Sequence, residues 1–244
     1  MSEYKAKITH LFHSGFIVET ENHTLVFDYF NPRTNSNLPS SGLLNFHYFA
    51  EKDNVFVLVS HSHSDHYTPE IFKWQSLNPN IKYILSDDVK AKDIKPNYYF
   101  MKKYEELKID KIKIKTYGTT DRGLSFLVKV DGLSIFHSGD LNWWHWKDDS
   151  PQVQAKEERD FKDEIEKIKD EKIDIAFVPV DPRLEEFYYL AGEYFARTIK
   201  PNLLVPMHFG DKFYITEKFK KKISNLYPEI PTISNIMDVI FFKE

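Results

Sequence analysis

The stretch VLVSHSHSDHYTPE, from Val57 to Glu70, places three histidines and an aspartate within six positions, directly after a run of apolar residues. In an extended segment, side chains two residues apart point the same way, so His61 and His63 can share one metal ion. Asp65 and His66 follow where the chain turns, and they can point toward a neighbouring position. The spacing predicts a metal site; the alternative is a polar, hydrogen-bonded turn after a strand.

Four segments of the chain share one design, in which a short apolar run ends in histidine or aspartate. Continuous apolar runs are typical of strands that are buried on both faces. Open, layered α/β sheets place their active sites at the carboxyl ends of such strands. The segments are NVFVLVSHSHSDH (54–66), LSIFHSGD (133–140), IDIAFVPVD (173–181) and NLLVPMHFGD (202–211).

The remaining elements predict one layered α/β domain that spans residues 1–244. The start of the chain predicts antiparallel strands. The long segment 31–54 is either disordered or a functional lid, and its aromatic residues Phe46, Tyr48 and Phe49 favour a lid. Proline at a first helical position and apolar residues at helical spacing indicate helices between the strands, with Thr216 as an expected N-cap. The strands are expected at 6–12, 15–20 and 24–30, and the helices at 69–77, 155–172, 184–201 and 216–228.

Composition narrows the function further. The formal net charge is -4 with no basic block, which argues against a large nucleic acid as partner. The chain contains no cysteine, so a metal ion must be held by nitrogen and oxygen from His, Asp and Glu. The start lacks an apolar signal core, and no stretch approaches about 18 uninterrupted apolar residues. We expect a cytoplasmic protein that acts on a small molecule and does not bind a membrane. The sequence does not predict the oligomeric state.

The pattern H-x-H-x-D-H after a buried strand resembles the signature of the metallo-β-lactamase superfamily. The resemblance implies a four-layer αββα sandwich with a metal site, often binuclear, at one edge. The stretch HSGFIVET (13–20) and the compact length look most like the branch of ascorbate-phosphate lactonase-like proteins. By this resemblance, Asp140 in HSGD bridges two metals and His208 in PMHFGD is the last ligand of the second metal. Without it, Asp140 could simply follow a glycine turn and His208 could be a core histidine.

Of the two implied ligand sets, one is complete in this sequence and the other lacks a histidine. The resemblance assigns Asp65, His66, Asp140 and His208 to one metal, and His61, His63 and Asp140 to the other. The family's third histidine for the latter metal is missing, because no histidine occurs between His66 and His137. Asp121 could replace it as an oxygen ligand, which would favour iron or manganese over zinc, or it could be a turn residue ahead of a strand. His145 could also reach this metal.

Three further residues are candidates for contact with the substrate or with the metal ligands. His13 in FHSGF matches a histidine that this branch often has near the metal, or it hydrogen-bonds at a strand turn. His145 and Trp143 lie in LNWWHWKDD, directly after Asp140, where dense aromatic residues form a pocket wall more often than a free surface loop. Together with the aromatic residues of segment 31–54, they would suit a flat substrate.

The predicted function is that of a metal-dependent hydrolase. One or two metal ions, zinc or else iron or manganese, would hold a hydroxide against an ester, lactone, amide or phosphodiester. Asp65 would orient that hydroxide or accept its proton. The alternatives are a phosphodiesterase for small nucleotides and a degenerate protein that binds a metal or ligand with an incomplete first site.

Overall fold

The structure is a computed structural model that describes residues 4–31, 46–226 and 228–243. Residues 32–45, which make up most of the predicted lid, lie outside the described residues. The chain divides into two compact units, residues 1–101 with 235–244 and residues 102–234. Each unit contains one sheet, which confirms the predicted α/β class. The single domain 1–244 stays a prediction.

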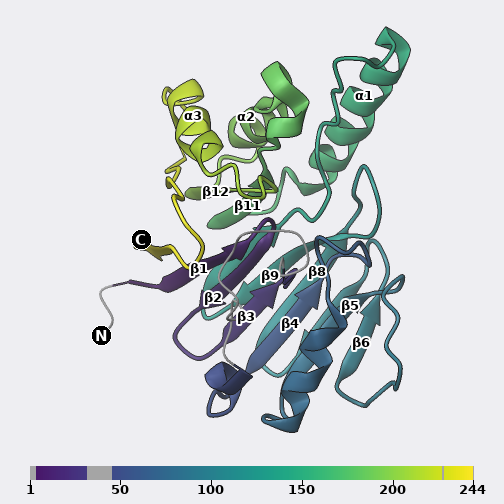
Figure 1. Ribbon diagram of the computed structural model, residues 1–244, viewed down its shortest axis with the longest axis vertical. Helices are drawn as coiled ribbons and strands as arrows, with labels where there is room; N and C mark the ends of the chain where they lie inside the picture. The colour runs from purple at the N-terminus through teal and green to yellow at the C-terminus, as the bar shows by residue number, and fades with distance from the viewer. Residues whose placement is uncertain (1–3, 32–45, 227, 244) are drawn as a thin grey trace. The chain divides into compact units, whose positions relative to one another are not determined.

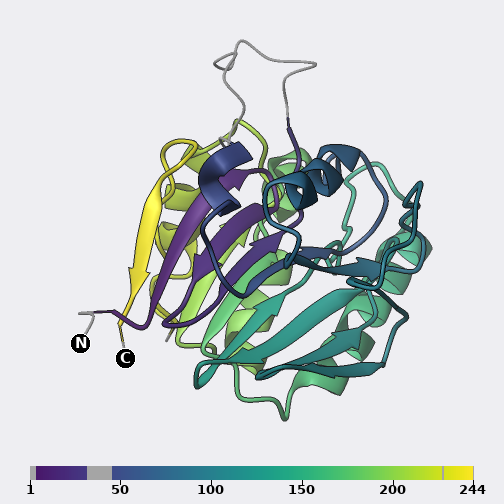
Figure 2. The ribbon, with the colours of Figure 1, turned by 90° about the horizontal axis from the view of Figure 1, so that it is seen from below.

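The first unit contains a seven-stranded sheet in the order β13-β1-β2-β3-β4-β5-β6. The pairs β13-β1, β1-β2 and β2-β3 are antiparallel, and the pairs β3-β4, β4-β5 and β5-β6 are parallel. Figure 2 shows β13, in yellow, beside β1 at the edge of this sheet. The strands are Ala6–Phe12 (β1), Gly15–Glu19 (β2), Thr24–Phe27 (β3), Val55–Val59 (β4), Lys82–Ser86 (β5), Tyr98–Met101 (β6) and Val239–Phe242 (β13).

Strand β4 carries an apolar residue at every position. All five residues of β4 are buried, because the strand lies between β3 and β5 and is covered on both faces. Two 3-10 helices complete the described part of this unit, η2 (Phe46–Phe49) and η3 (Pro69–Ser76). Phe49 is buried against Trp74, with ring centroids 4.8 Å apart. The expectation that Phe49 lines a substrate pocket is therefore wrong, because its ring belongs to the core of the first unit.

The second unit contains a six-stranded sheet in the order β12-β11-β10-β9-β8-β7. Here β10, β11 and β12 run parallel, and the other neighbours are antiparallel. Figure 1 shows its helices α1, α2 and α3. The elements are Glu106–Ile109 (β7), Ile112–Tyr117 (β8), Ser125–Val130 (β9), Leu133–His137 (β10), Pro151–Ile168 (α1), Ile175–Pro179 (β11), Pro182–Phe187 (η4), Leu190–Thr198 (α2), Leu203–Met207 (β12) and Tyr214–Lys222 (α3).

The helices of the second unit begin and end differently from the expected ranges. Helix α1 begins at Pro151 because Ser150 caps it, its Oγ accepting from the Val153 amide. The single helix expected at 184–201 is two, η4 and α2, and Glu185 has a φ of 52°, which a continuous helix does not allow. Thr216 is not an N-cap. It lies inside α3, where its hydroxyl donates to backbone carbonyls.

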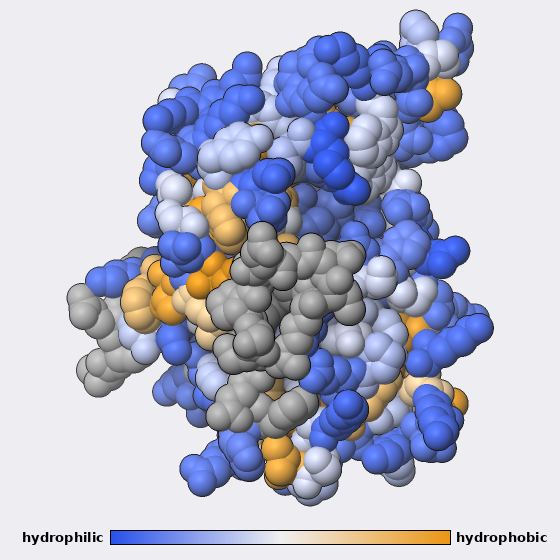
Figure 3. Space-filling model, in the orientation of Figure 1, coloured by the Kyte–Doolittle hydropathy of each residue, from blue (hydrophilic) through white to orange (hydrophobic). Residues whose placement is uncertain are grey.

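Within the part of the chain that the structure describes, no helix is long and apolar enough to cross a membrane. The face drawn in Figure 3 is mostly hydrophilic.

Glu171 ties the end of α1 to two strands of the second sheet. Its carboxylate accepts from Lys115 on β8 at 2.7 Å, from Lys129 on β9 at 2.8 Å and from the Tyr117 hydroxyl at 3.0 Å. Burial raises the pKa of Glu171, but these donors outweigh it and lower the pKa to about 2. A carboxylate with a depressed pKa stabilises the fold fully above its ordinary value and loses that contribution as the pH falls through its folded value.

We therefore expect the free energy of unfolding to fall by roughly 2 kcal/mol between pH 4.5 and 2 because of Glu171 alone. Urea unfolding across this range measures it. In Glu171→Gln, that part of the decline should disappear, whereas in Glu166→Gln, which removes an exposed pair with Lys169, it should remain. An unchanged decline in Glu171→Gln would contradict the prediction.

Candidate metal centre

The first unit gathers polar side chains at the carboxyl ends of three parallel strands. Asp28 follows β3, His61 follows β4 and Asp88 follows β5. The carboxyl ends of parallel strands meet at one edge of a sheet, so these groups are neighbours although they are far apart in sequence. The design predicted from VLVSHSHSDH therefore recurs on the two neighbouring strands.

Asp28 orients two histidines of the signature stretch. It is fully buried and accepts from the Ser60 amide at 2.7 Å, the Ser60 hydroxyl at 2.6 Å and His66 Nδ1 at 2.8 Å. Because the Ser60 hydroxyl donates to Asp28, it accepts from His61 Nδ1, 3.0 Å away. Both imidazoles thus carry their proton on Nδ1, which puts the lone pair on Nε2, the atom that would bind a metal ion.

Asp88 fixes the loop between the two signature histidines. It accepts from the Ser62 amide at 3.1 Å and from the Ser62 hydroxyl at 2.9 Å. Ser62 separates His61 from His63, whose ring centroids are 4.6 Å apart. The H-x-H segment is therefore held on both sides, by Asp28 through Ser60 and by Asp88 through Ser62.

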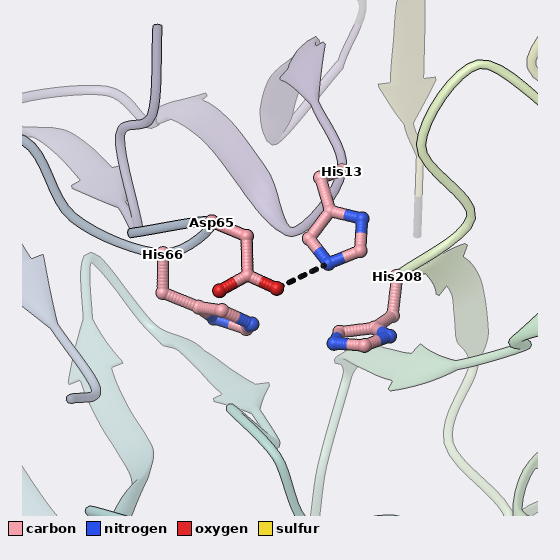
Figure 4. A group of neighbouring side chains, drawn as sticks. All are labelled: His13, Asp65, His66 and His208. Carbon is pink, nitrogen blue, oxygen red and sulfur yellow. Dashed lines mark ion pairs between the residues drawn. The ribbon is translucent and has the colours of Figure 1, made fainter. Parts of the chain in front are cut away.

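Two groups of ligand atoms result in the first unit. One atom from each of His13, Asp65 and His66 lies within 4.8 Å of the others, and the same holds for His61 with His63. Figure 4 shows His13 and Asp65 joined by an ion-pair contact, which measures 3.6 Å between Nε2 and Oδ2, together with His66. His13, predicted to be near the metal, therefore lies among the predicted ligands of this unit.

The second unit repeats the design at the carboxyl ends of its own parallel strands. Asp140 follows β10, Asp181 follows β11 and His208 follows β12. His208 Nδ1 donates to Asp181 Oδ2 at 3.0 Å, and His208 Nε2 lies 3.2 Å from Asp140 Oδ1. His208 therefore has the same arrangement as His66, with a buried carboxylate on Nδ1 and Nε2 directed toward a predicted ligand.

Arg183 completes this arrangement. Its guanidinium donates to both oxygens of Asp181 through Nε and Nη2, and Nη2 lies 3.4 Å from His208 Nδ1. Burial raises the pKa of Asp181, but the hydrogen bonds from His208 and Arg183 outweigh it and hold the pKa below its ordinary value. Asp181 is therefore an ionised acceptor that fixes the ring of His208.

The backbone is strained at three of these residues. His13, Asp28 and His208 have φ values of 54°, 41° and 66°, in the left-handed region that non-glycine residues seldom adopt. Such conformations cost about 1 to 3 kcal/mol each and are concentrated at functional sites. Gly15 permits the close approach of two of these segments, because a Cβ there would lie 3.0 Å from the carbonyl oxygens of Phe12 and Asp28.

Three predicted site residues lie apart from these groups. Asp121 is exposed and belongs to neither group of ligand atoms found among the described residues, so it stays a prediction without structural support. His145 packs against Phe187, with ring centroids 4.3 Å apart. Trp143 stacks on Phe161 of α1 at 6.0 Å, so its ring contacts a helix rather than a predicted ligand.

Sequence reasoning assigned no role to Asp28, Asp88, Asp181 or Arg183. A signal was present for the aspartates, since each follows an apolar strand, as Asp140 does. The segment IDIAFVPVD ends in Asp181, but spacing alone does not show which histidine that aspartate faces.

The donor set fits a transition-metal ion. It offers imidazole nitrogens and carboxylate oxygens, which suit zinc, iron and manganese. Histidines that bind metals generally donate their other ring nitrogen to a carboxylate, carbonyl or hydroxyl group, and His61, His66 and His208 all do so.

Comparisons with known proteins identify the family and the fold. A family model described as a β-lactamase superfamily domain matches residues 7–208. The fold is similar to Igni18, a metallo hydrolase from Ignicoccus hospitalis, with a TM-score of 0.67 and 16% identity over 98% of this chain and 99% of that one. It is also similar to YhfI, a metallo-β-lactamase fold protein from Bacillus subtilis, with a TM-score of 0.58 and 14% identity over 96% and 98% of the chains.

A third similar structure belongs to a protein with different chemistry. CmlA, a diiron β-hydroxylase from Streptomyces venezuelae, has a TM-score of 0.60 and 9% identity over 99% of this chain and 55% of that one. At these identities the likeness concerns the fold alone. No curated protein matches the sequence. The family match covers most of the chain and confirms the predicted family and fold: the chain belongs to the metallo-β-lactamase superfamily.

Proposed function

We propose that the protein is a metal-dependent hydrolase of small molecules, whose ligands are those that the family resemblance implies, with His13 added. His208 would join His13, Asp65 and His66 at one metal ion, and Asp140 would join His61 and His63 at the other. The observation that carries this proposal is the pair of oriented histidines, His66 on Asp28 and His208 on Asp181. Strained backbone at His13 and His208 supports it.

His13 takes a larger part here than the sequence assigned to it. Its contact with Asp65 and its place beside His66 make it a fourth ligand for the ion that His208 would complete. The other ion would have only His61, His63 and Asp140, so we expect it to bind more weakly.

A bound divalent ion would supply acidified water and would polarise a carbonyl or phosphoryl oxygen. Asp65 is the residue that would orient the attacking water and accept its proton, because its side chain is 45% exposed, whereas Asp28, Asp140 and Asp181 are almost fully buried. Hydrolysis of an ester, lactone, amide or phosphodiester follows from these roles. Zinc as the native ion, the lactonase-like branch and a cytoplasmic location remain our predictions.

Metal analysis of single variants tests whether the two units share their ions. We expect the purified protein to contain one or two transition-metal ions per chain, and His66→Ala and His208→Ala each to lose at least half of them. His47→Ala, which removes an exposed histidine, should bind as the wild type does. Elemental analysis of the purified proteins gives the counts.

Two results would contradict the proposal. Wild-type protein without metal, even after incubation with zinc, iron or manganese, would favour a degenerate binding protein. Loss of metal in only one of the two variants would show that His66 and His208 do not bind the same ion.

A further inference from the structure

The segment after Asp140 forms a distinct surface beside His208 within the second unit. The ring of Trp144 meets the ring of His208 edge-on, with centroids 5.7 Å apart. Trp144 is parallel to Trp146 within 5°, and the guanidinium of Arg183 lies over Trp146 at 5.9 Å. We call Trp144, Trp146 and Arg183 the indole–guanidinium face. None of the metal-binding roles proposed above uses the two tryptophans.

The two indole rings leave aromatic surface uncovered. Parallel rings in contact lie about 3.5 Å apart, yet the centroids of Trp144 and Trp146 are separated by 6.1 Å. The rings are therefore either offset or separated by a gap, and in both cases part of each ring's face is not covered by the other ring. Trp146 is also 36% exposed. Exposed, rigid indole surface of this kind suits the flat side of a planar group.

Trp144 also offers a polar atom. Its Nε1 is buried and has no hydrogen-bond acceptor among the described residues. Buried indole N–H groups ordinarily find an acceptor, and leaving one without is costly. An acceptor oxygen of a bound molecule would satisfy this group beside His208.

Arg183 adds charged donors to the same surface. Its side chain is 55% exposed, although Nε and Nη2 are held by Asp181. Asp181 offsets part of its charge, so the attraction would come mainly from directed N–H groups, which match carboxylate and phosphate oxygens. The acidic Glu185 and Glu186 follow after Leu184, and Lys147 pairs with both of them, at 3.2 and 3.6 Å.

We propose that the indole–guanidinium face binds a planar, anionic part of the substrate, a ring or conjugated group that carries a carboxylate or a phosphate. Trp146 and Trp144 bind the plane, and Trp144 Nε1 with Arg183 binds the anionic oxygens. This assignment rests on the proposed hydrolase function, because it places the reacting bond of such a substrate beside His208.

Calorimetric binding of four probes tests the substrate class without any need for turnover. The probes are 2-naphthoate, 2-naphthyl phosphate, 2-naphthamide and cyclohexanecarboxylate, and each is measured with metal-loaded and with chelator-treated protein. At least one of the two planar anions should bind at least about tenfold more tightly than the neutral amide and the non-planar acid. The tighter of the two identifies the anion as carboxylate or phosphate.

Variants connect this binding to the face. Trp146→Ala should weaken the favoured probe about tenfold, and Trp144→Phe, which keeps a ring but removes Nε1, should weaken it about threefold to tenfold. Trp143→Phe is the matched control, since Trp143 also has a buried Nε1 without an acceptor among the described residues, but its ring packs on α1. Thermal unfolding verifies that each variant is folded.

Each outcome of these measurements either supports or contradicts the proposed binding face. Equal affinity for all four probes, no binding of any of them, unchanged affinity in Trp146→Ala, or equal loss in Trp143→Phe would overturn the proposal. Selective binding by protein that neither holds metal nor hydrolyses any substrate would support the face and contradict the hydrolase. Hydrolysis by protein that binds the planar anions no more tightly than the other probes would support the hydrolase and contradict the face.

Discussion

Replacing Asp140 with alanine should abolish hydrolysis, lowering the rate by about a thousandfold or more. In the proposed centre, Asp140 is the second unit's carboxylate ligand, and its Oδ1 lies 3.2 Å from His208 Nε2. Losing it would remove a charged ligand and leave His208 without the neighbour that Nε2 faces. Electrostatic stabilisation by a bound metal contributes several kcal/mol to such reactions, and each 1.36 kcal/mol is about tenfold in rate.

A panel of generic lactone, ester and phosphodiester substrates measures this effect, with zinc, iron or manganese supplied in turn. Asp121→Ala is the matched control, because Asp121 was the alternative ligand from the sequence and is exposed. It should retain the wild-type rate. Full activity in Asp140→Ala would contradict the proposed centre, and a comparable loss in Asp121→Ala would restore Asp121 as a ligand.

The sequence predicted those elements whose signal is local. Strand β4 reads as a continuous apolar run because it is buried on both faces, and the signature histidines follow it directly. Strand β7 was not predicted, because its residues alternate between exposed and half-buried and give no such run. Thr216 has the residue type of an N-cap, but its hydroxyl bonds to Ile233, 17 residues away, which no local rule can anticipate.

In the candidate site, too, the sequence predicts local features and misses those that depend on distant residues. The ligands that spacing predicts lie in one short stretch, whereas their supports are distant in sequence. Asp28 is 38 residues from His66, and Asp181 is 27 residues from His208. Strand order brings these partners together, and strand order cannot be read from periodicity. Asp121 remains a prediction, since its place in the chain suits a ligand, but its side chain is exposed and it belongs to neither group of ligand atoms among the described residues.

Asp28→Asn should weaken metal binding about tenfold to a hundredfold, although the substitution keeps the shape of the side chain. Asparagine tolerates the left-handed backbone that Asp28 adopts, with a φ of 41°, so the exchange adds little strain. An amide group in place of Oδ2 would donate to His66 Nδ1 instead of accepting from it. The proton of His66 would then move to Nε2, the atom that has to bind the metal.

Asp28→Ala should combine this loss with lower stability. It leaves the Ser60 amide, the Ser60 hydroxyl and His66 Nδ1 without their buried acceptor, and it places alanine at a positive φ. We expect the free energy of unfolding to fall by about 3 kcal/mol.

Metal titration and urea unfolding separate the two effects of Asp28. Asp87→Ala, at an exposed aspartate of the same unit, should change neither quantity. If Asp28→Asn bound metal as tightly as the wild type, the tautomer of His66 would not depend on Asp28. If Asp28→Ala lost stability but kept its metal affinity, Asp28 would serve the fold alone. Weakened metal binding in Asp28→Asn at nearly unchanged stability is the result that only an orienting role explains.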